Sequence, residues 1–251
     1  MNFFFGISDQ ELKCQLTIAK FQNKSNAKDH SLYSLFIKNN EWNIFEVKCD
    51  QDEHFYYVNN SFFNEFSFFF LAKKNEINKF DNNKLVNLNK FTDTMPAFRA
   101  NMKIYNNQGG FSSYQSEYPF SMTLKTGSIL SPISPLTNIN ADKNFVYLPN
   151  LHEKPIKKEF EIFLVDLTER KVLFKKKILT NNVNCIKIDK EFIKPDVFLF
   201  TKEYLAVPVF VSTKNFHLSC EHTHPPLTYI LSKDRFQTIA QLKREVNEII
   251  T

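Results

Sequence analysis

The stretch EFEIFLVDLTERKVLFKKKIL, residues 159–179, carries the pattern that decides the fold of this chain. In its second half, apolar residues alternate with basic ones: Val172, Phe174 and Ile178 against Lys171, Lys175 and Lys177. Because successive side chains of a strand point to opposite faces, this period of two predicts strands rather than a helix. The residues LTER, 167–170, separate the two halves and suit a tight turn. The stretch therefore predicts an antiparallel hairpin.

Segments of the same kind recur on both sides of this hairpin. They are rich in Phe, Tyr, Ile and Val and are separated by Asn, Asp and Lys clusters, as in strands joined by turns. The segments before the hairpin are LKCQLTIAK (12–20), SLYSLFIK (31–38), WNIFEVK (42–48), HFYYV (54–58), FSFFFL (66–71) and AFRANMKIY (97–105). The segments after it are VNCIKID (183–189), DVFLF (196–200), LAVPVFVS (205–212) and FHLSCEHTH (216–224). We therefore expect an all-β, mainly antiparallel protein.

The chain is long enough for two modest domains, and LPNLHEKP, residues 148–155, suits a linker because it holds two prolines among polar residues. We expect a β-rich N-terminal domain over residues 1–150. Residues 156–234 then contain six or seven expected strands, the number typical of an Ig-like β-sandwich. The Cys, Trp and Cys spacing of true immunoglobulin domains is missing, so the expected likeness is one of architecture only. No internal sequence repeat is evident.

One amphipathic helix is expected at the C-terminus, over residues 235–251. The segment RFQTIAQLKREVNEII has apolar residues at helical spacing: Phe236, Ile239, Leu242, Val246, Ile249 and Ile250. We expect this apolar stripe to cover a sheet or to bind a partner.

The composition, 43% hydrophobic and 24% charged, is typical of a soluble globular protein. The net charge is +5, but the lysines are interleaved with 27 acidic residues and only four arginines are present. Nucleic-acid recognition prefers clustered arginine and lysine, so no nucleic-acid partner is expected. The four cysteines are far apart and form no paired motif, which favours reduced thiols. With no secretory signal and no apolar run near the ~20 residues that span a bilayer, we expect a cytoplasmic protein without a membrane partner.

The stretch HLSCEHTHPP, residues 217–226, contains three of the six histidines. On a strand, Cys220, His222 and His224 share one face, and residues two apart are separated by roughly 6.5–7 Å. Two imidazoles and a thiolate at this spacing can reach a common ion, so these three residues are a candidate site for zinc or another divalent transition metal. The alternative is the ordinary polar end of a strand, which the two prolines terminate.

A second candidate is the stretch NNQGGFSSYQSEYPF, residues 106–120, which shows no helix or strand period and holds two of the four glycines. Long irregular loops in compact domains are often binding elements. We predict that four of its residues, together with an arginine on the preceding segment, bind a small polar or carbohydrate-like ligand. These candidates are Arg99, Tyr114, Gln115, Glu117 and Tyr118. The alternative is a compact Ω-loop that its own aromatic rings hold down.

No standard catalytic motif is present, so catalytic residues are not identified and the chain is not assigned as an enzyme. The expected function is a non-catalytic binding or interaction protein whose partner is a small polar ligand or another protein. The alternative is a metal-assisted enzyme centred on His222 and His224, with Glu117 or Glu221 as the base. Oligomeric state is not indicated.

Overall fold

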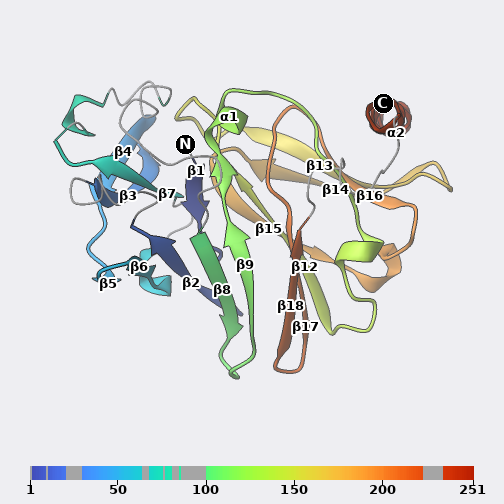
Figure 1. The fold of residues 1–251 in the computed structure, drawn as a ribbon. Helices are drawn as coiled ribbons and strands as arrows, with labels where there is room; N and C mark the ends of the chain where they lie inside the picture. The colour runs from blue at the N-terminus through green and yellow to red at the C-terminus, as the bar shows by residue number, and fades with distance from the viewer. Residues whose placement is uncertain are drawn as a thin grey trace. The chain divides into compact units, whose positions relative to one another are not determined.

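The computed structural model describes residues 2–9, 11–20, 30–63, 68–75, 77–80, 85, 100–222 and 234–251. Within them the chain forms four antiparallel sheets and ends in one long helix, α2 (Arg235–Ile250), as Figure 1 shows. The expected all-β, mainly antiparallel fold is confirmed, including the hairpin predicted from residues 159–179.

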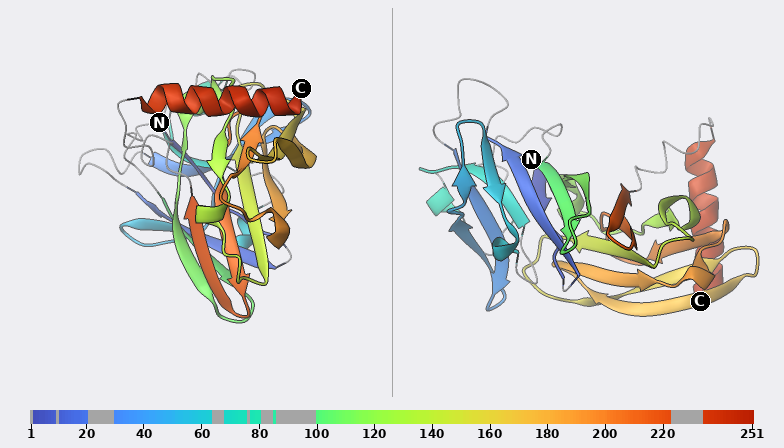
Figure 2. Two further views of the ribbon diagram at one scale, coloured as in Figure 1. Left: turned by 90° about the vertical axis from the view of Figure 1, so that its right-hand side faces the viewer. Right: turned by 90° about the horizontal axis from the view of Figure 1, so that it is seen from below.

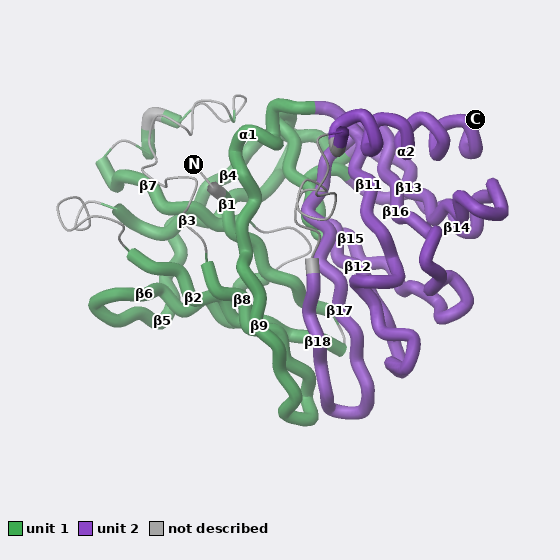
Figure 3. Tube along the Cα trace, turned by 45° about the vertical axis from the view of Figure 1, so that its right-hand side comes forward, with its two compact units in different colours: residues 1–125, 149–157, 180–183 green, residues 126–148, 158–179, 184–251 purple. Residues whose placement is uncertain are grey.

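The chain divides into two compact units, which Figure 3 colours separately. Unit 1 comprises residues 1–125, 149–157 and 180–183, and unit 2 comprises residues 126–148, 158–179 and 184–251. The chain therefore leaves unit 1 and returns to it twice. The boundaries predicted near residues 150, 156 and 234 stay a prediction about independently folding domains.

Unit 1 holds two five-stranded sheets. The first runs, in spatial order, β10 (Tyr118–Pro119), β1 (Asn2–Phe5), β7 (Phe68–Lys73), β3 (His30–Lys38) and β4 (Glu41–Glu46). The second runs β5 (Asp50–Gln51), β6 (Phe55–Val58), β2 (Leu12–Ala19), β8 (Ala100–Asn106) and β9 (Phe111–Ser116). The buried Ser116 hydroxyl links the sheets, because it donates to the Phe5 carbonyl oxygen at 2.6 Å and accepts from the Phe5 N–H at 2.7 Å.

Unit 2 is a sandwich of two four-stranded sheets. The first runs β11 (Leu130–Pro132), β16 (Val197–Thr201), β13 (Glu159–Asp166) and β14 (Lys171–Leu179). The second runs β15 (Asn182–Ile188), β12 (Lys143–Asn150), β17 (Val209–Lys214) and β18 (His217–His222). One apolar cluster lies between them, to which Ile162, Leu199, Val146 and Phe210 contribute from four strands of both sheets.

The two units share one topology. When β5 and β10 are left out, unit 1 has eight strands, as unit 2 has. If the eight strands of each unit are numbered in chain order, both units have the same pairs of neighbouring strands. Thus β1-β7-β3-β4 matches β11-β16-β13-β14, and β6-β2-β8-β9 matches β15-β12-β17-β18. As in an immunoglobulin domain, the second strand pairs with the fifth and the third with the sixth. The first strand, however, lies beside the sixth, and the seventh lies beside the second. The likeness to the immunoglobulin fold is therefore one of two packed antiparallel sheets, not of complete strand order.

Helix α2 covers the outer face of the sheet β11-β16-β13-β14 within unit 2. Figure 2 shows it crossing the strands as a single straight helix. Val246 is fully buried and packs in one cluster with Phe163, Val165 and Phe200. The expected covering role is confirmed, with one correction: Phe236 is 64% exposed, because the helix contacts the sheet through its later turns.

Among the described residues of this glycine-poor chain, asparagine occupies four of the seven left-handed backbone positions. Asn39 and Asn40 have φ values of 55° and 60° in the two-residue turn that joins β3 to β4. Asn215 has a φ of 52° in another two-residue turn, between β17 and β18. Asn181 has a φ of 54° between β14 and β15. Asparagine tolerates this conformation better than other non-glycine residues, which is why the β3–β4 and β17–β18 turns close without glycine.

The segment expected to be a linker, 148–155, is ordered structure. Its first three residues belong to β12, and residues 149–157 belong to unit 1, where we call them the strap. The strap supplies carbonyl acceptors to buried side chains: Trp42 Nε1 donates to Glu153 at 3.0 Å, and the Tyr118 hydroxyl donates to Leu151 at 3.1 Å. Proline content indicated a linker, but these hydrogen bonds fix the segment.

Candidate functional site

The stretch 106–120 is a β-hairpin followed by a short strand, not the irregular loop that its sequence suggested. β8 and β9 pair from Ala100↔Ser116 to Tyr105↔Phe111, and the turn between them is residues 107–110. The side chain of Asn106 caps this turn, because its Oδ1 accepts from the Gln108 N–H at 3.0 Å and the Gly110 N–H at 3.1 Å. β9 has the sequence FSSYQS, in which both faces mix serines with larger residues, and this obscured the strand period.

One of the predicted ligand-binding residues is inaccessible, and another is not among the described residues. Tyr118 is fully buried, with its ring edge-on to Phe68 at 5.6 Å between centroids. Burial raises the pKa of its hydroxyl, although the hydrogen bond to Leu151 acts in the opposite direction. Tyr118 is therefore a core residue with no exposed surface to offer a ligand. Arg99 lies outside the described residues.

The other three candidates point in different directions. Tyr114 is half-buried and pairs with the fully buried Met102, so it faces the interior side of its sheet. Gln115 is exposed and pairs with exposed Asn101, so it faces the outer side. Glu117 follows β9 and is half-buried. Of the four predicted residues that the structure describes, Gln115 alone lies on the surface described next.

The outer face of the sheet β5-β6-β2-β8-β9 carries exposed polar and aromatic side chains, and we call it the polar sheet face. On β2, the apolar residues Leu12, Cys14, Leu16 and Ile18 are buried while the residues between them are half-exposed. Cross-strand pairing aligns the outer side chains in three rows: Tyr57, Thr17, Asn101 and Gln115; Gln15, Lys103 and Ser113; Lys13, Tyr105 and Phe111.

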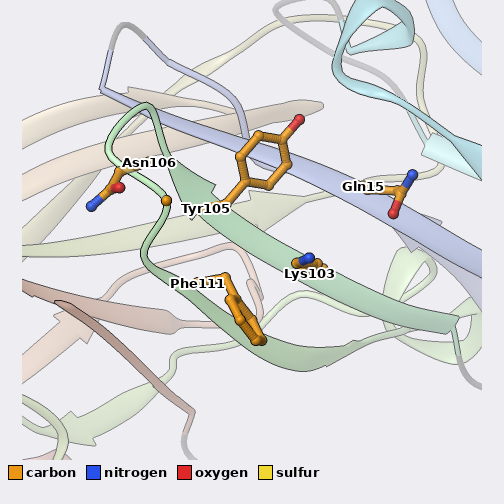
Figure 4. A pocket seen from close by; sticks show the side chains of 6 residues that line it. Gln15, Lys103, Tyr105, Asn106 and Phe111 are labelled. Carbon is orange, nitrogen blue, oxygen red and sulfur yellow. The ribbon is translucent and has the colours of Figure 1, made fainter. Parts of the chain in front are cut away.

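A depression of about 290 Å³ lies on this face, lined by six residues: Gln15, Lys103, Tyr105, Asn106, Gly109 and Phe111. Figure 4 shows them on β2, β8, β9 and the β8–β9 turn. Gly109 has a φ of 94°, and no atom lies within 4 Å of the position a Cβ would take, so the turn leaves the rim open. The depression thus combines two aromatic rings, two amides and one ammonium group.

Two contacts hold side chains of the depression in place. Gln15 Nε2 donates to Asn59 Oδ1 at 2.7 Å, and Asn59 Nδ2 donates to Asp50 Oδ2 at 3.4 Å. Figure 4 shows that this leaves the Gln15 carbonyl oxygen on the side of Lys103. The Lys103 ammonium lies 4.5 Å from the centroid of the Phe111 ring, a favourable cation–π geometry.

The far edge of the same face carries acidic groups. The Asp52 carboxylate accepts from the Tyr57 hydroxyl at 2.7 Å and from the His54 and Phe55 N–H groups. These hydrogen bonds, that from Tyr57 first, lower the pKa of Asp52, and the same bond raises the pKa of Tyr57. The face is therefore polarised, with carboxylates at β5 and β6 and lysines at β2 and β8.

A second depression, of about 540 Å³, lies beside β4. Its charged groups already bind one another: Glu46 accepts from the Ser31 hydroxyl at 2.6 Å and lies 3.8 Å from the Lys74 ammonium. Because Glu46 and Lys74 already pair with each other, whereas Lys103 forms no ion pair with a described residue, the polar sheet face is the stronger candidate.

The predicted metal residues are only partly described. The register of β18 places Cys220 opposite Val211 and His222 opposite Val209, while His224 lies outside the described residues. Burial, with a smaller contribution from Glu221, raises the pKa of the Cys220 thiol to about 12. Among the described residues, no group of three or more His, Cys, Asp or Glu side chains could hold a metal ion. The zinc site and the metal-assisted enzyme stay predictions.

Sequence reasoning did not identify Gln15, Lys103, Tyr105 and Phe111 as one site, because β2 is distant in the sequence from the β8–β9 hairpin. The sequence did contain one signal: in LKCQLTIAK, polar residues alternate with apolar ones, which indicates a strand with one polar, outward face. In comparisons with known proteins, no family model, no curated protein and no solved structure matches this chain. No helix in the described part of the chain has the length and apolar character needed to cross a membrane.

Proposed function

We propose that this protein is a non-catalytic binding protein and that its polar sheet face binds a small polar, carbohydrate-like ligand. The observation that carries the proposal is the depression between β2, β8 and β9, where exposed aromatic rings lie beside fixed amide groups. Binding sites typically combine apolar contact surface with a few placed polar groups. A polyhydroxylated ring matches this set, because its C–H face packs on an aromatic ring while its hydroxyls bond to amides.

The exposed aromatic ring is the most informative group. Phe111 is 61% exposed on β9, and its ring borders the depression. Contact area of this kind contributes about 1 kcal/mol beyond simple burial when another group stacks on it. We therefore expect Phe111→Ala to lower ligand affinity about ten-fold, which corresponds to about 1.4 kcal/mol.

The chain offers a matched control for this substitution. Phe45 is 60% exposed on β4, in the other sheet of unit 1, and stacks on Phe36. Phe45→Ala removes an equally exposed ring without touching the polar sheet face, so ligand affinity should not change. Gln15→Ala should weaken binding as Phe111→Ala does, since it removes the acceptor held by Asn59.

The test is a glycan-binding screen with the full chain, followed by titration calorimetry on the three variants. Binding that Phe111→Ala and Gln15→Ala weaken, and that Phe45→Ala leaves intact, supports the proposal. Absence of any glycan ligand, or equal effects of both phenylalanine variants, overturns it.

A further inference from the structure

The polar sheet face has a distribution of charge that restricts which sugar fits it. Lys103 lines the depression, and Lys13 lies diagonally opposite on β2, since Lys13 pairs with Tyr105 and Gln15 pairs with Lys103. Diagonal neighbours on adjacent strands are about 7–8 Å apart, within reach of long side chains. Both ammonium groups can therefore approach one anionic group.

Neither lysine is neutralised within the described part of the chain. Lys13 and Lys103 form no ion pair there, and the contact that Lys103 makes is the one with the Phe111 ring. The neighbouring carboxylate of Asp9 is occupied by the N–H groups of Glu11 and Leu12, at 2.7 and 2.8 Å. An anion at the depression would thus gain two charged donors without displacing an ion pair.

The opposite edge of the face carries the carboxylates of Asp50 and Asp52, and the Lys20 ammonium near them donates to Gln51 Oε1 at 2.8 Å. Asp50 and Asp52 are held there by hydrogen bonds from Asn59 and Tyr57. A ligand with one acidic group is therefore favoured in one orientation, with that group at the lysines and its hydroxyls along the row from Gln115 to Tyr57. That row spans four strands at about 4.8 Å between neighbours, which is wider than one hexose ring.

From these observations we infer that the ligand of the polar sheet face is an acidic oligosaccharide whose carboxylate or sulfate binds Lys103 and Lys13. The inference rests on the proposed function and adds the charge, the length and the orientation of the ligand. Charged donors on an anion make stronger hydrogen bonds than neutral ones, and screening by salt weakens them.

Titration calorimetry on the full chain would compare four probes: an oligogalacturonate, its neutral methyl ester, a sulfated dextran oligosaccharide and its unsulfated parent. We expect an acidic probe to bind at least ten-fold more tightly than its neutral counterpart. Whichever acidic probe binds more tightly identifies the anion as carboxylate or sulfate. The advantage should shrink when ionic strength rises from about 0.1 M to about 1 M, because the Debye length falls from about 10 Å to about 3 Å.

Lys103→Ala and Lys13→Ala should each lower affinity for the acidic probe about ten-fold more than affinity for the neutral probe. Lys38, exposed on β3 in the other sheet, provides the control, and Lys38→Ala should have no effect. Unaltered circular dichroism shows that each variant is folded, and the conservative variant Lys103→Gln repeats the test at a similar side-chain length.

The outcomes separate this inference from the proposed function. If acidic and neutral probes bind equally and only Phe111→Ala weakens them, the proposed function stands and the acidic-ligand inference fails. If no probe binds, both fail. Competition by single-stranded DNA at equal affinity would identify a phosphate-backbone site and would also overturn the inference.

Discussion

Replacing Asn181 tests whether one buried side chain holds the strap to the body of unit 1. Its Oδ1 accepts from the His152 N–H at 2.7 Å, and its Nδ2 donates to the Lys154 and Ile156 carbonyls at 2.7 and 3.1 Å. Each such bond contributes about 1 kcal/mol net, so Asn181→Ala loses about 3 kcal/mol from them. Alanine at a φ of 54° costs a further ~1 kcal/mol. We expect the free energy of unfolding to fall by about 4 kcal/mol.

Two other variants separate these contributions. Asn181→Gly accepts the left-handed backbone and loses only the hydrogen bonds, so it should cost about 3 kcal/mol. Asn215→Ala, at a φ of 52° in an exposed turn, should cost only the backbone term of about 1 kcal/mol.

The assay is urea denaturation followed by tryptophan fluorescence. Trp42 is the sole tryptophan of the chain and donates to the strap carbonyl of Glu153, so its emission reports on the segment that Asn181 holds. A loss below 1 kcal/mol in Asn181→Ala, or an Asn181→Gly variant as unstable as Asn181→Ala, would refute the reasoning.

Three further predictions concern the helix, a buried thiol and the histidine strand. Val246→Ala should lower the free energy of unfolding by about 2 kcal/mol, because the side chain is fully buried against the sheet. Phe236→Ala should change it by no more than about 0.5 kcal/mol, since Phe236 is exposed. Thermal or urea denaturation measures both, and equal effects would contradict the packing of α2. Burial raises the pKa of Cys14 from 9.0 to about 12, so between these values the unfolded chain loses a proton that the folded chain keeps, and stability should fall by about 1.4 kcal/mol per pH unit. Cys14→Ala should show a shallower decline in alkaline melts, and an unchanged slope would count against a buried thiol. If the histidine strand binds metal, protein purified without chelator or tag should contain stoichiometric metal by elemental analysis and lose it in His222→Ala or His224→Ala; metal-free wild-type protein would exclude the site.

The strands and the C-terminal helix were predictable because their signals are local. The alternation in residues 159–179 and the apolar stripe of the last 16 residues depend only on neighbours in the chain. Prediction failed where distant hydrogen bonds decide the structure. The prolines of residues 148–155 suggested a linker, yet Asn181 and Trp42 bind the strap from elsewhere in the chain.

The repeated topology and the polar sheet face were not predictable from single segments. Strand order depends on pairings between distant residues, the longest being that of Asn2 with Pro119, and equivalent strands of the two units share no evident sequence repeat. The rows of the polar sheet face take every second residue from β2, β8 and β9, so each strand contributes residues that are separated in the sequence by buried or half-buried ones. Gln115 was selected for its place in a presumed loop, whereas its exposure comes from its place on an edge strand.

Unit 1 is completed late in ribosomal synthesis, because it is built from three segments that are separated in the sequence. Its first 125 residues emerge early, but residues 149–157 and 180–183 follow only after long stretches of unit 2. At about 5–20 residues per second, the nascent unit waits several seconds for them. During that interval Trp42 and Tyr118 lack the carbonyl acceptors of the strap, and Asn181, which secures the strap, arrives last. Until residues 149–157 and 180–183 have been synthesised, residues 1–125 lack part of the hydrogen bonding that completes unit 1.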